Sequence, residues 1–223
     1  SSEDRQDLRH ARPPLWAALG VLFCLPTVLS ILHMEAFLSS TLAVAIAEIG
    51  DKTQLLALFL AARFNQKSAI IAGIFVSTLL NHLLSAVIGV WLAQFVSPEM
   101  MKWIVGISFI AVGLWLLVPD KDGATNNRWL QYGAFGATVA LFFLAEIGDK
   151  TQIATVLLAA KYQSMLWVVA GSTLGLMLAN VPVVYLGHAL MKKIPAKAVR
   201  LAACALFCIL GAATLLGSGI ALS

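Results

Sequence analysis

The octapeptide Ala-Glu-Ile-Gly-Asp-Lys-Thr-Gln occurs twice in this chain, at Ala47–Gln54 and at Ala145–Gln152. Both copies lie within runs of Leu, Ala, Val and Phe. One charged side chain at the centre of a membrane helix costs about 2.5–3.5 kcal/mol. The two carboxylates and one ammonium of each copy would together cost very roughly 15–20 kcal/mol if left unpaired, which exceeds the stability of a typical domain. We therefore expect these groups to be paired or hydrated.

The composition is that of a polytopic, all-α membrane protein. Of 223 residues, 60% are hydrophobic and only 12% are charged. Apolar runs such as 69–95 and 198–222 contain a single ionisable residue each, and about 20 apolar residues suffice to span a bilayer as a helix. The net charge of +4 does not indicate a nucleic-acid partner, because the basic residues lie in short loops. We expect the partners to be the lipid bilayer and a transported ion.

A shift of 98 residues lays the chain over itself, from the octapeptide to the pair Gly113 and Gly211. Each copy holds three apolar segments, at 36–62, 69–95 and 101–118, and at 130–160, 164–190 and 198–222. We predict an extension at 1–33, a first repeat at 34–118, a linker at 119–129 and a second repeat at 130–223. Because each repeat has an odd number of spans, the second enters the membrane from the opposite side. The sequence thus predicts six core helices in inverted topology, an architecture typical of secondary transporters.

The loop charges predict the orientation. Two basic residues, Lys102 and Lys161, fall on one side of the predicted membrane. Eight fall on the other: Arg63, Lys67, Lys121, Arg128, Lys192, Lys193, Lys197 and Arg200. By the positive-inside rule the second side, with the linker, is cytoplasmic and the C-terminus lies outside. The run 14–32 then crosses outward as a seventh helix or is a signal peptide. A retained helix is favoured because no small-x-small cleavage site stands near its end.

The motif chemistry depends on how its side chains are arranged. On a continuous helix Glu48, Asp51 and Lys52 share an arc of about 100°, whereas Thr53 points elsewhere. Lys52 follows Glu48 at i+4, the favourable order for an ion pair. Gly50 permits a break or a close helix approach, and Gln54 lies one turn beyond Asp51. The second copy repeats this arrangement with Glu146, Asp149, Lys150, Thr151 and Gln152.

The charge of the two motifs predicts a divalent cation as ligand. Each motif carries two carboxylates and one ammonium, so two motifs that meet sum to −2 when ionised. Carboxylate, amide and hydroxyl oxygens suit Ca²⁺, Mg²⁺ and Mn²⁺, and the motif has no Cys or His to favour zinc or copper. The alternative is a structural Glu–Lys pair that locks two helices together. Two identical motifs on corresponding helices favour the functional interpretation.

Three further polar residues lie at mid-span. Asn81 and His82 stand near the centre of the second segment, and Asn180 stands on the corresponding segment of the second repeat. They could complete a coordination shell or pass protons. Interhelical hydrogen bonding is the alternative for each of them.

Two Glu-x-Gly-Asp-Lys/Arg-Thr/Ser motifs on a duplicated three-helix unit resemble the Gdt-type cation/proton exchanger family, which includes bacterial Mne-type manganese exporters. Here they read Glu48-Ile-Gly-Asp51-Lys-Thr53 and Glu146-Ile-Gly-Asp149-Lys-Thr151. The resemblance covers about 34–223 and implies exchange of Mn²⁺ or Ca²⁺ for protons in a bacterial inner membrane, with Mn²⁺ export preferred. It also implies that the four acids bind the cation as substrate, without a resident cofactor.

Two other classes of function remain open. A divalent-cation channel could use the same acidic residues, but channels usually need an axial pore. An intramembrane metal-dependent enzyme could use them too, although we expect such a site near a membrane face. Transport insensitive to a pH gradient would favour the channel, and product formation without ion flux would favour the enzyme.

Overall fold

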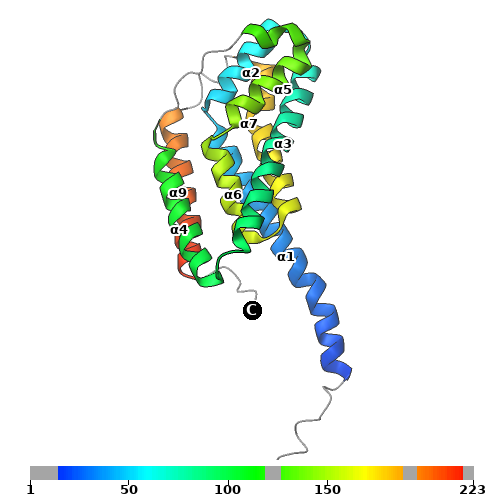
Figure 1. Cartoon of the computed structure of the whole chain (residues 1–223), viewed down its shortest axis with the longest axis vertical. Coiled ribbons are helices and arrows are strands. Elements are labelled where there is room, and N and C mark those ends of the chain that lie inside the picture. Colours follow the sequence, from blue (N-terminus) through cyan, green and yellow to red (C-terminus); the bar gives the residue numbers. More distant parts are fainter. Residues whose placement is uncertain (1–14, 119–126, 188–194, 218–223) are drawn as a thin grey trace, which may run out of the picture. The chain divides into compact units, whose positions relative to one another are not determined.

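A computed structural model describes residues 15–118, 127–187 and 195–217, with side chains from Leu29 onward (Figure 1). Every regular element in these ranges is helical. In chain order they are α1 (Leu15–Glu48), α2 (Lys52–Arg63), α3 (Lys67–Ala93), α4 (Pro98–Trp115), the 3₁₀ helix η2 (Asn127–Tyr132), α5 (Gly133–Glu146), α6 (Lys150–Tyr162), α7 (Met165–Leu186) and α9 (Ala196–Leu215). The chain divides into two compact units, Ser1–Glu35 and Ala36–Ser223, and both octapeptides lie in the second.

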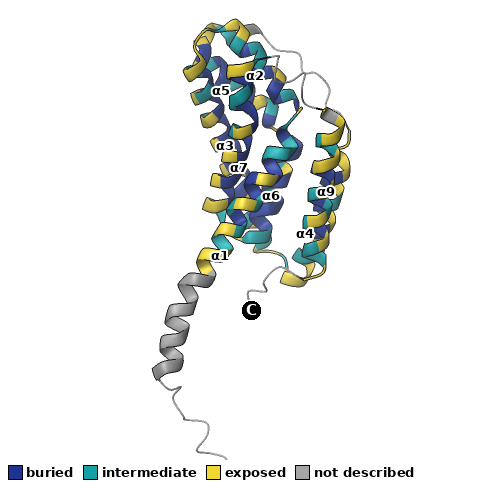
Figure 2. Cartoon of the chain, turned by 180° about the vertical axis from the view of Figure 1, so that it is seen from behind, coloured by how far each residue is buried: buried dark blue, intermediate teal, exposed yellow. Residues whose placement is uncertain are grey.

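The described helices have the inside-out polarity of a membrane protein. Five of them are long and apolar enough to cross a membrane, or six if the bent pair α5–α6 counts as one span. Large apolar side chains such as Phe95, Leu166 and Leu216 are 70–81% exposed, whereas Glu48 and Glu146 are fully buried. Buried residues line the interior of the helix bundle, as Figure 2 shows. Exposed apolar side chains and buried carboxylates would both be unfavourable in water, so this distribution indicates a membrane environment. The polytopic all-α class predicted from composition is confirmed.

The boundary predicted between the extension and the first core segment, near residue 33, falls within α1, a continuous helix of 34 residues. The two compact units divide close to the same place, after Glu35. No Gly or Pro stands at 31–36 to end a helix, so local propensity favours continuation. The structure does not describe residues 1–14, most of the predicted linker 119–129, the basic residues Lys121, Lys192 and Lys193, or the C-terminal residues 218–223. The orientation and the fate of residues 1–33 stay predictions.

The first segment of each repeat is broken at the octapeptide. α1 ends at Glu48 and α2 begins at Lys52, while α5 ends at Glu146 and α6 begins at Lys150. In the second repeat the two halves meet at a bend of 72°. The continuous helix assumed for the motif geometry is therefore wrong, and the break that Gly50 was said to permit is present. In Figure 1, α1 leads upward into α2 whereas α5 leads downward into α6.

The octapeptide contains the signals that stop one helix and start the next. Ile147 has φ −61° and ψ 121°, Gly148 has φ +73°, and the Asp149 N–H bonds the Glu146 carbonyl at 3.1 Å. This is a type II turn, which requires a positive φ that glycine adopts without strain. Asp149 then caps α6 by accepting from the Thr151 N–H at 3.5 Å. Gly50 at φ +83° and Asp51 repeat the arrangement before α2.

The two repeats pack against each other through reciprocal contacts. Gly73 on α3 lies against the Phe135 carbonyl, which a Cβ on that glycine would approach to 3.0 Å. Its counterpart 98 residues on, Gly171 on α7, lies against the carbonyl of Phe37, the counterpart of Phe135, at 2.3 Å. Gly73 of the first repeat therefore contacts Phe135 of the second, and Gly171 of the second repeat contacts Phe37 of the first. This is the pattern of a two-fold interface, here within one chain.

The pair α4–α9 shows the same reciprocity. Gly113 lies against the Cys204 carbonyl and Gly211 against the Gly106 carbonyl, at 3.1 and 2.7 Å for an added Cβ. Glycine lets the two backbones approach closely, as is common where membrane helices pack. α4 also packs against α6, which joins the α4–α9 pair to the α3–α5–α6–α7 bundle.

Candidate cation site

The two helix breaks bring four carboxylates to helix ends in the interior. Glu48 and Glu146 are the last residues of α1 and α5, and Asp51 and Asp149 cap α2 and α6. The C-terminus of a helix carries a partial negative charge, so Glu48 and Glu146 stand where an anion is disfavoured and a cation is favoured. Broken helices with such termini form the ion sites of many secondary transporters.

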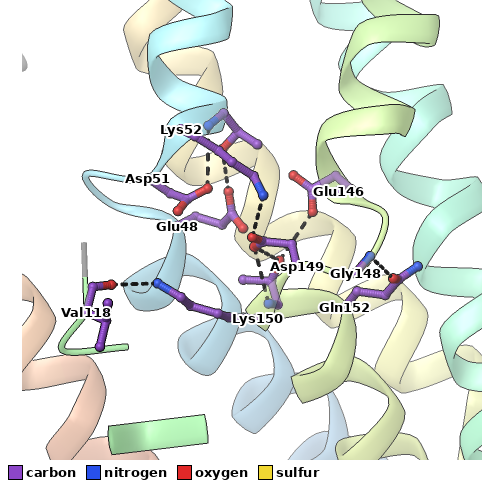
Figure 3. Close-up of polar contacts among 11 residues, drawn as sticks. Glu48, Asp51, Lys52, Val118, Glu146, Gly148, Asp149, Lys150 and Gln152 are labelled. Atoms are coloured by element: carbon purple, nitrogen blue, oxygen red, sulfur yellow. Dashed lines mark hydrogen bonds and ion pairs between the residues drawn. The ribbon is translucent and has the colours of Figure 1, made fainter. Parts of the chain in front are cut away.

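Three of these carboxylates converge. Glu48, Asp51 and Asp149 each offer one oxygen, and the three oxygens lie within 4.8 Å of one another. All three residues are at most 8% exposed. Two come from the first motif and one from the second, so the cluster joins the repeats, as Figure 3 shows. Oxygen ligands at this spacing suit a hard divalent cation.

The fourth carboxylate lies beside this cluster and is joined to it by Thr151. The Thr151 hydroxyl lies 3.2 Å from Oε2 of Glu146 and 3.3 Å from Oδ2 of Asp149. One oxygen of Glu48 and one of Glu146, Oε1 in each case, are buried without a partner among the described residues. Buried acceptors are rarely left unsatisfied. These two oxygens fit a site that receives a cation or protons.

The threonines contribute more than the sequence predicted. Thr53 was expected to point away from the acids, but its hydroxyl donates to Oε2 of Glu48 at 2.7 Å. That expectation was wrong because it assumed a continuous helix, whereas the turn at Gly50 redirects α2. Thr53 and Thr151 thus hold the glutamate of their own motif by the same contact.

The two motif lysines occupy different places. The i+4 pair expected between Lys52 and Glu48 does not form, because the helix ends between them. The Lys52 ammonium instead lies 2.6 Å from Oδ1 of Asp149 in the other motif. The Lys150 ammonium donates to the Val118 carbonyl at 2.8 Å and lies 5.8 Å from the centroid of the Trp115 ring. Sequence reasoning could not find Val118, since a backbone acceptor has no side-chain signature.

The glutamines stabilise the turns. The Gly50 N–H donates to Oε1 of Gln54 at 2.8 Å, and the Gly148 N–H donates to Oε1 of Gln152 at 2.6 Å. Gln54 also donates to the Ala179 carbonyl on α7 at 2.9 Å. Both glutamines therefore shape the helix breaks, and neither donates to a motif carboxylate within the described chain.

The mid-span residues Asn81, His82 and Asn180 are fully buried. Asn81 donates to the Phe143 carbonyl at 3.3 Å, and Asn180 donates to the Leu176 carbonyl at 3.2 Å. Their amide oxygens and both ring nitrogens of His82 have no partner within the described residues. The structure brings none of the three into the 4.8 Å cluster, so a part in coordination or proton transfer stays a prediction.

A small pocket of about 20 Å³ reaches Asp51 from one side. It lies between the α1–α2 break and the ends of α4 and α9. Besides Asp51 its polar lining includes Lys150 and Arg200, and Val118 lies at its wall. Of the three clustered carboxylates, Asp51 is the one that lines this pocket.

Comparisons with known proteins show which proteins this chain resembles. A family model described as "Divalent cation/proton antiporter GDT1" matches residues 36–124 and 134–220. A Vibrio cholerae protein named "Putative manganese exporter" is 47% identical over 183 residues, which cover 81% of this chain and 90% of that protein. GDT1-like proteins of Synechocystis and Arabidopsis thaliana are 28% and 26% identical, over 75% and 82% of this chain and 90% and 96% of theirs. No solved structure matches.

Proposed function

This chain belongs to the GDT1 family of divalent cation/proton antiporters, and from that premise we propose that it exports Mn²⁺ from the cytoplasm in exchange for protons. The family makes it an integral membrane transporter of a divalent cation and protons. The choice of Mn²⁺ is supported by the relative named a manganese exporter, which shares 47% identity. Ca²⁺ exchange by the same mechanism is the second candidate, because the clustered ligands are all oxygens.

The observation that carries the proposal is the cluster of Glu48, Asp51 and Asp149 oxygens within 4.8 Å. We assign these three residues and Glu146 as the cation ligands. Protons and a divalent cation compete for the same carboxylates, and this competition couples their movements in opposite directions. Cation entering from the cytoplasm releases protons, and protons from outside later release the cation.

The proposed transport cycle is alternating access between inverted repeats. It is supported by the opposed directions of α1–α2 and α5–α6 and by the reciprocal glycine contacts. The pocket beside Asp51 is also lined by Arg200, one of the basic residues from which the loop charges predict the cytoplasmic side. In this arrangement the protein resides in a bacterial inner membrane with its C-terminus outside.

The test is proton release from inverted vesicles that contain the full chain. Mn²⁺, Ca²⁺ and Mg²⁺ are added in turn across a series of pH values, and proton flux is followed with a pH-sensitive dye. We expect saturable proton movement opposite to Mn²⁺ movement. Cation uptake unaffected by a pH gradient would indicate a channel instead, and Ca²⁺ preferred over Mn²⁺ would select the second candidate.

A further inference from the structure

The two motifs are identical in sequence, but their lysines make different contacts. This difference is a departure from the symmetry of the repeats. Elsewhere the repeats make reciprocal contacts, as Gly73 and Gly171 do. The Lys52 ammonium, however, lies on the second motif at Asp149, whereas the Lys150 ammonium lies at the end of α4 on Val118. Because the two octapeptides are identical, the different contacts of Lys52 and Lys150 arise from the conformation of the protein and not from the local sequence.

Lys52 occupies a ligand of the proposed cation site. Its ammonium lies 2.6 Å from Oδ1 of Asp149, and an Asp149 oxygen belongs to the three-carboxylate cluster. An ammonium and a divalent cation that bind the same carboxylate repel each other strongly. The side chain of Lys52 is 25% exposed, so it has space to withdraw. A divalent cation that binds Asp149 therefore competes with Lys52 for the same carboxylate.

Lys150 is held in a second place suited to a cation. The Val118 carbonyl lies in the turn that follows the C-terminal end of α4 and accepts a hydrogen bond from the ammonium. The Trp115 ring adds a cation–π contact at 5.8 Å. Lys150 and Asp51 line the same pocket, so this lysine lies in the region of the acid that corresponds to Asp149.

We propose that Lys52 and Lys150 alternate as the internal counter-ion of the carboxylate cluster. In the described conformation Lys52 neutralises Asp149, and Lys150 donates to the Val118 carbonyl just beyond α4. When the transporter opens to the opposite side the repeats exchange roles, so Lys150 pairs with Asp51 and Lys52 moves to the end of α9. The carbonyl corresponding to Val118 there is that of Leu216, 98 residues on. This inference rests on the proposed function.

The alternation explains how an empty site can reorient. Four carboxylates without a cation repel one another across the helix breaks. In each conformation the ammonium of one motif lysine, Lys52 or Lys150, reduces that repulsion. Lys52 is at the first position of α2 and Lys150 at that of α6, where the helix dipole disfavours a cation. Neither helix gains stability from its lysine, which agrees with a role in the cluster.

The experiment compares Lys52→Met with Lys150→Met, a matched pair that removes the same charge from the same motif position. The full chain is placed in lipid nanodiscs, and free Mn²⁺ is measured by its paramagnetic resonance signal. We expect Lys52→Met to lower the Mn²⁺ dissociation constant at least fivefold and Lys150→Met to change it less than twofold. Lys52→Arg should stay near wild type, and Lys52→Gln should reproduce Lys52→Met if the Met variant does not fold.

Exchange in vesicles gives the second readout. Both Met variants should lose at least tenfold in Mn²⁺-dependent proton flux, because each lacks the counter-ion of one conformation. Equal tightening of Mn²⁺ binding in the two variants, weaker binding in Lys52→Met, or normal flux in Lys150→Met would overturn the alternation. Absence of Mn²⁺ binding and proton flux in the wild type would instead overturn the proposed function.

Discussion

The ammonium of Lys52 on α2 lies 2.6 Å from Oδ1 of Asp149 at the start of α6, so an ion pair joins the two motifs. The residues are 97 apart in the chain and come from different repeats. Because each motif ends one helix and starts another, neither could form this pair within itself. The cluster is a product of the duplication, and substitutions in either motif should affect the same site.

Asp149→Asn should abolish cation-dependent proton release. The substitution removes a charged ligand of the cluster and the partner of Lys52 together. Changes outside the direct ligands of a metal already cost about 10–100-fold, so we expect a loss above about 100-fold in vesicles. Glu48→Gln should behave alike. Glu99→Gln, at an exposed position in the first turn of α4, is the control. Flux retained in Asp149→Asn would remove this residue from the site.

Thr53→Val should destabilise the protein, whereas Thr53→Ser should not. The Thr53 hydroxyl donates a hydrogen bond to the buried carboxylate of Glu48, at 2.7 Å. A buried acceptor that loses its donor costs about 1–3 kcal/mol, and serine keeps the hydroxyl. Thermal unfolding in detergent at one pH measures the difference. Equal melting temperatures for the two variants would show that this bond contributes nothing to stability.

Lower pH should weaken Mn²⁺ binding. Cation binding needs ionised carboxylates and releases the protons they held, so the apparent affinity falls as pH falls. One proton released per cation gives about a tenfold change per pH unit, and two give about a hundredfold change. Titration of the wild type with Mn²⁺ in nanodiscs between pH 6 and 8 yields the number of protons released per cation directly. A flat profile would mean that protons do not share the cation site.

The amino-acid sequence was sufficient to predict the membrane class and to single out candidate site residues, but not to predict the contacts of those residues. Charge within apolar runs singled out Glu48, Asp51, Glu146 and Asp149 because such groups are costly unless they are used. The break between helices was also encoded locally. Asp51-x-x-Gln54 is a helix-start pattern that follows a glycine, and this pattern predicts a new helix rather than the continuous one that was assumed.

Other features depend on tertiary structure alone. The Lys52–Asp149 pair requires knowing how two segments 97 residues apart meet. The contact of Lys150 with Val118 uses a backbone carbonyl, which every residue possesses. Since the two motifs are identical in sequence, their residues alone could not assign different positions to Lys52 and Lys150.

Gly148→Ala tests the turn without a steric clash. A Cβ at this position would meet nothing within 4 Å, so the only cost is the positive φ of 73°. That conformation costs an L-residue about 1–2 kcal/mol, which lowers the melting temperature of a chain this size by roughly 2–8 °C. Gly148→Asn should recover part of the loss because asparagine tolerates the left-handed region better. Stability unchanged in Gly148→Ala would mean that the turn differs from type II.

Gly171→Ala tests the contact between the repeats. A Cβ on Gly171 would lie 2.3 Å from the Phe37 carbonyl oxygen, which belongs to the backbone and cannot rotate away. Overpacking of this kind costs about 1–3 kcal/mol, or roughly 2–12 °C in melting temperature. Ala170→Val adds volume at the neighbouring exposed position of α7 and should leave stability unchanged. Because Gly73 makes the corresponding contact with Phe135, Gly73→Ala should also destabilise: the added Cβ would lie 2.7 Å from Cβ of Thr138, which is fixed to the backbone. Equal stability of Gly171→Ala and Ala170→Val would refute the close approach of α7 to α1.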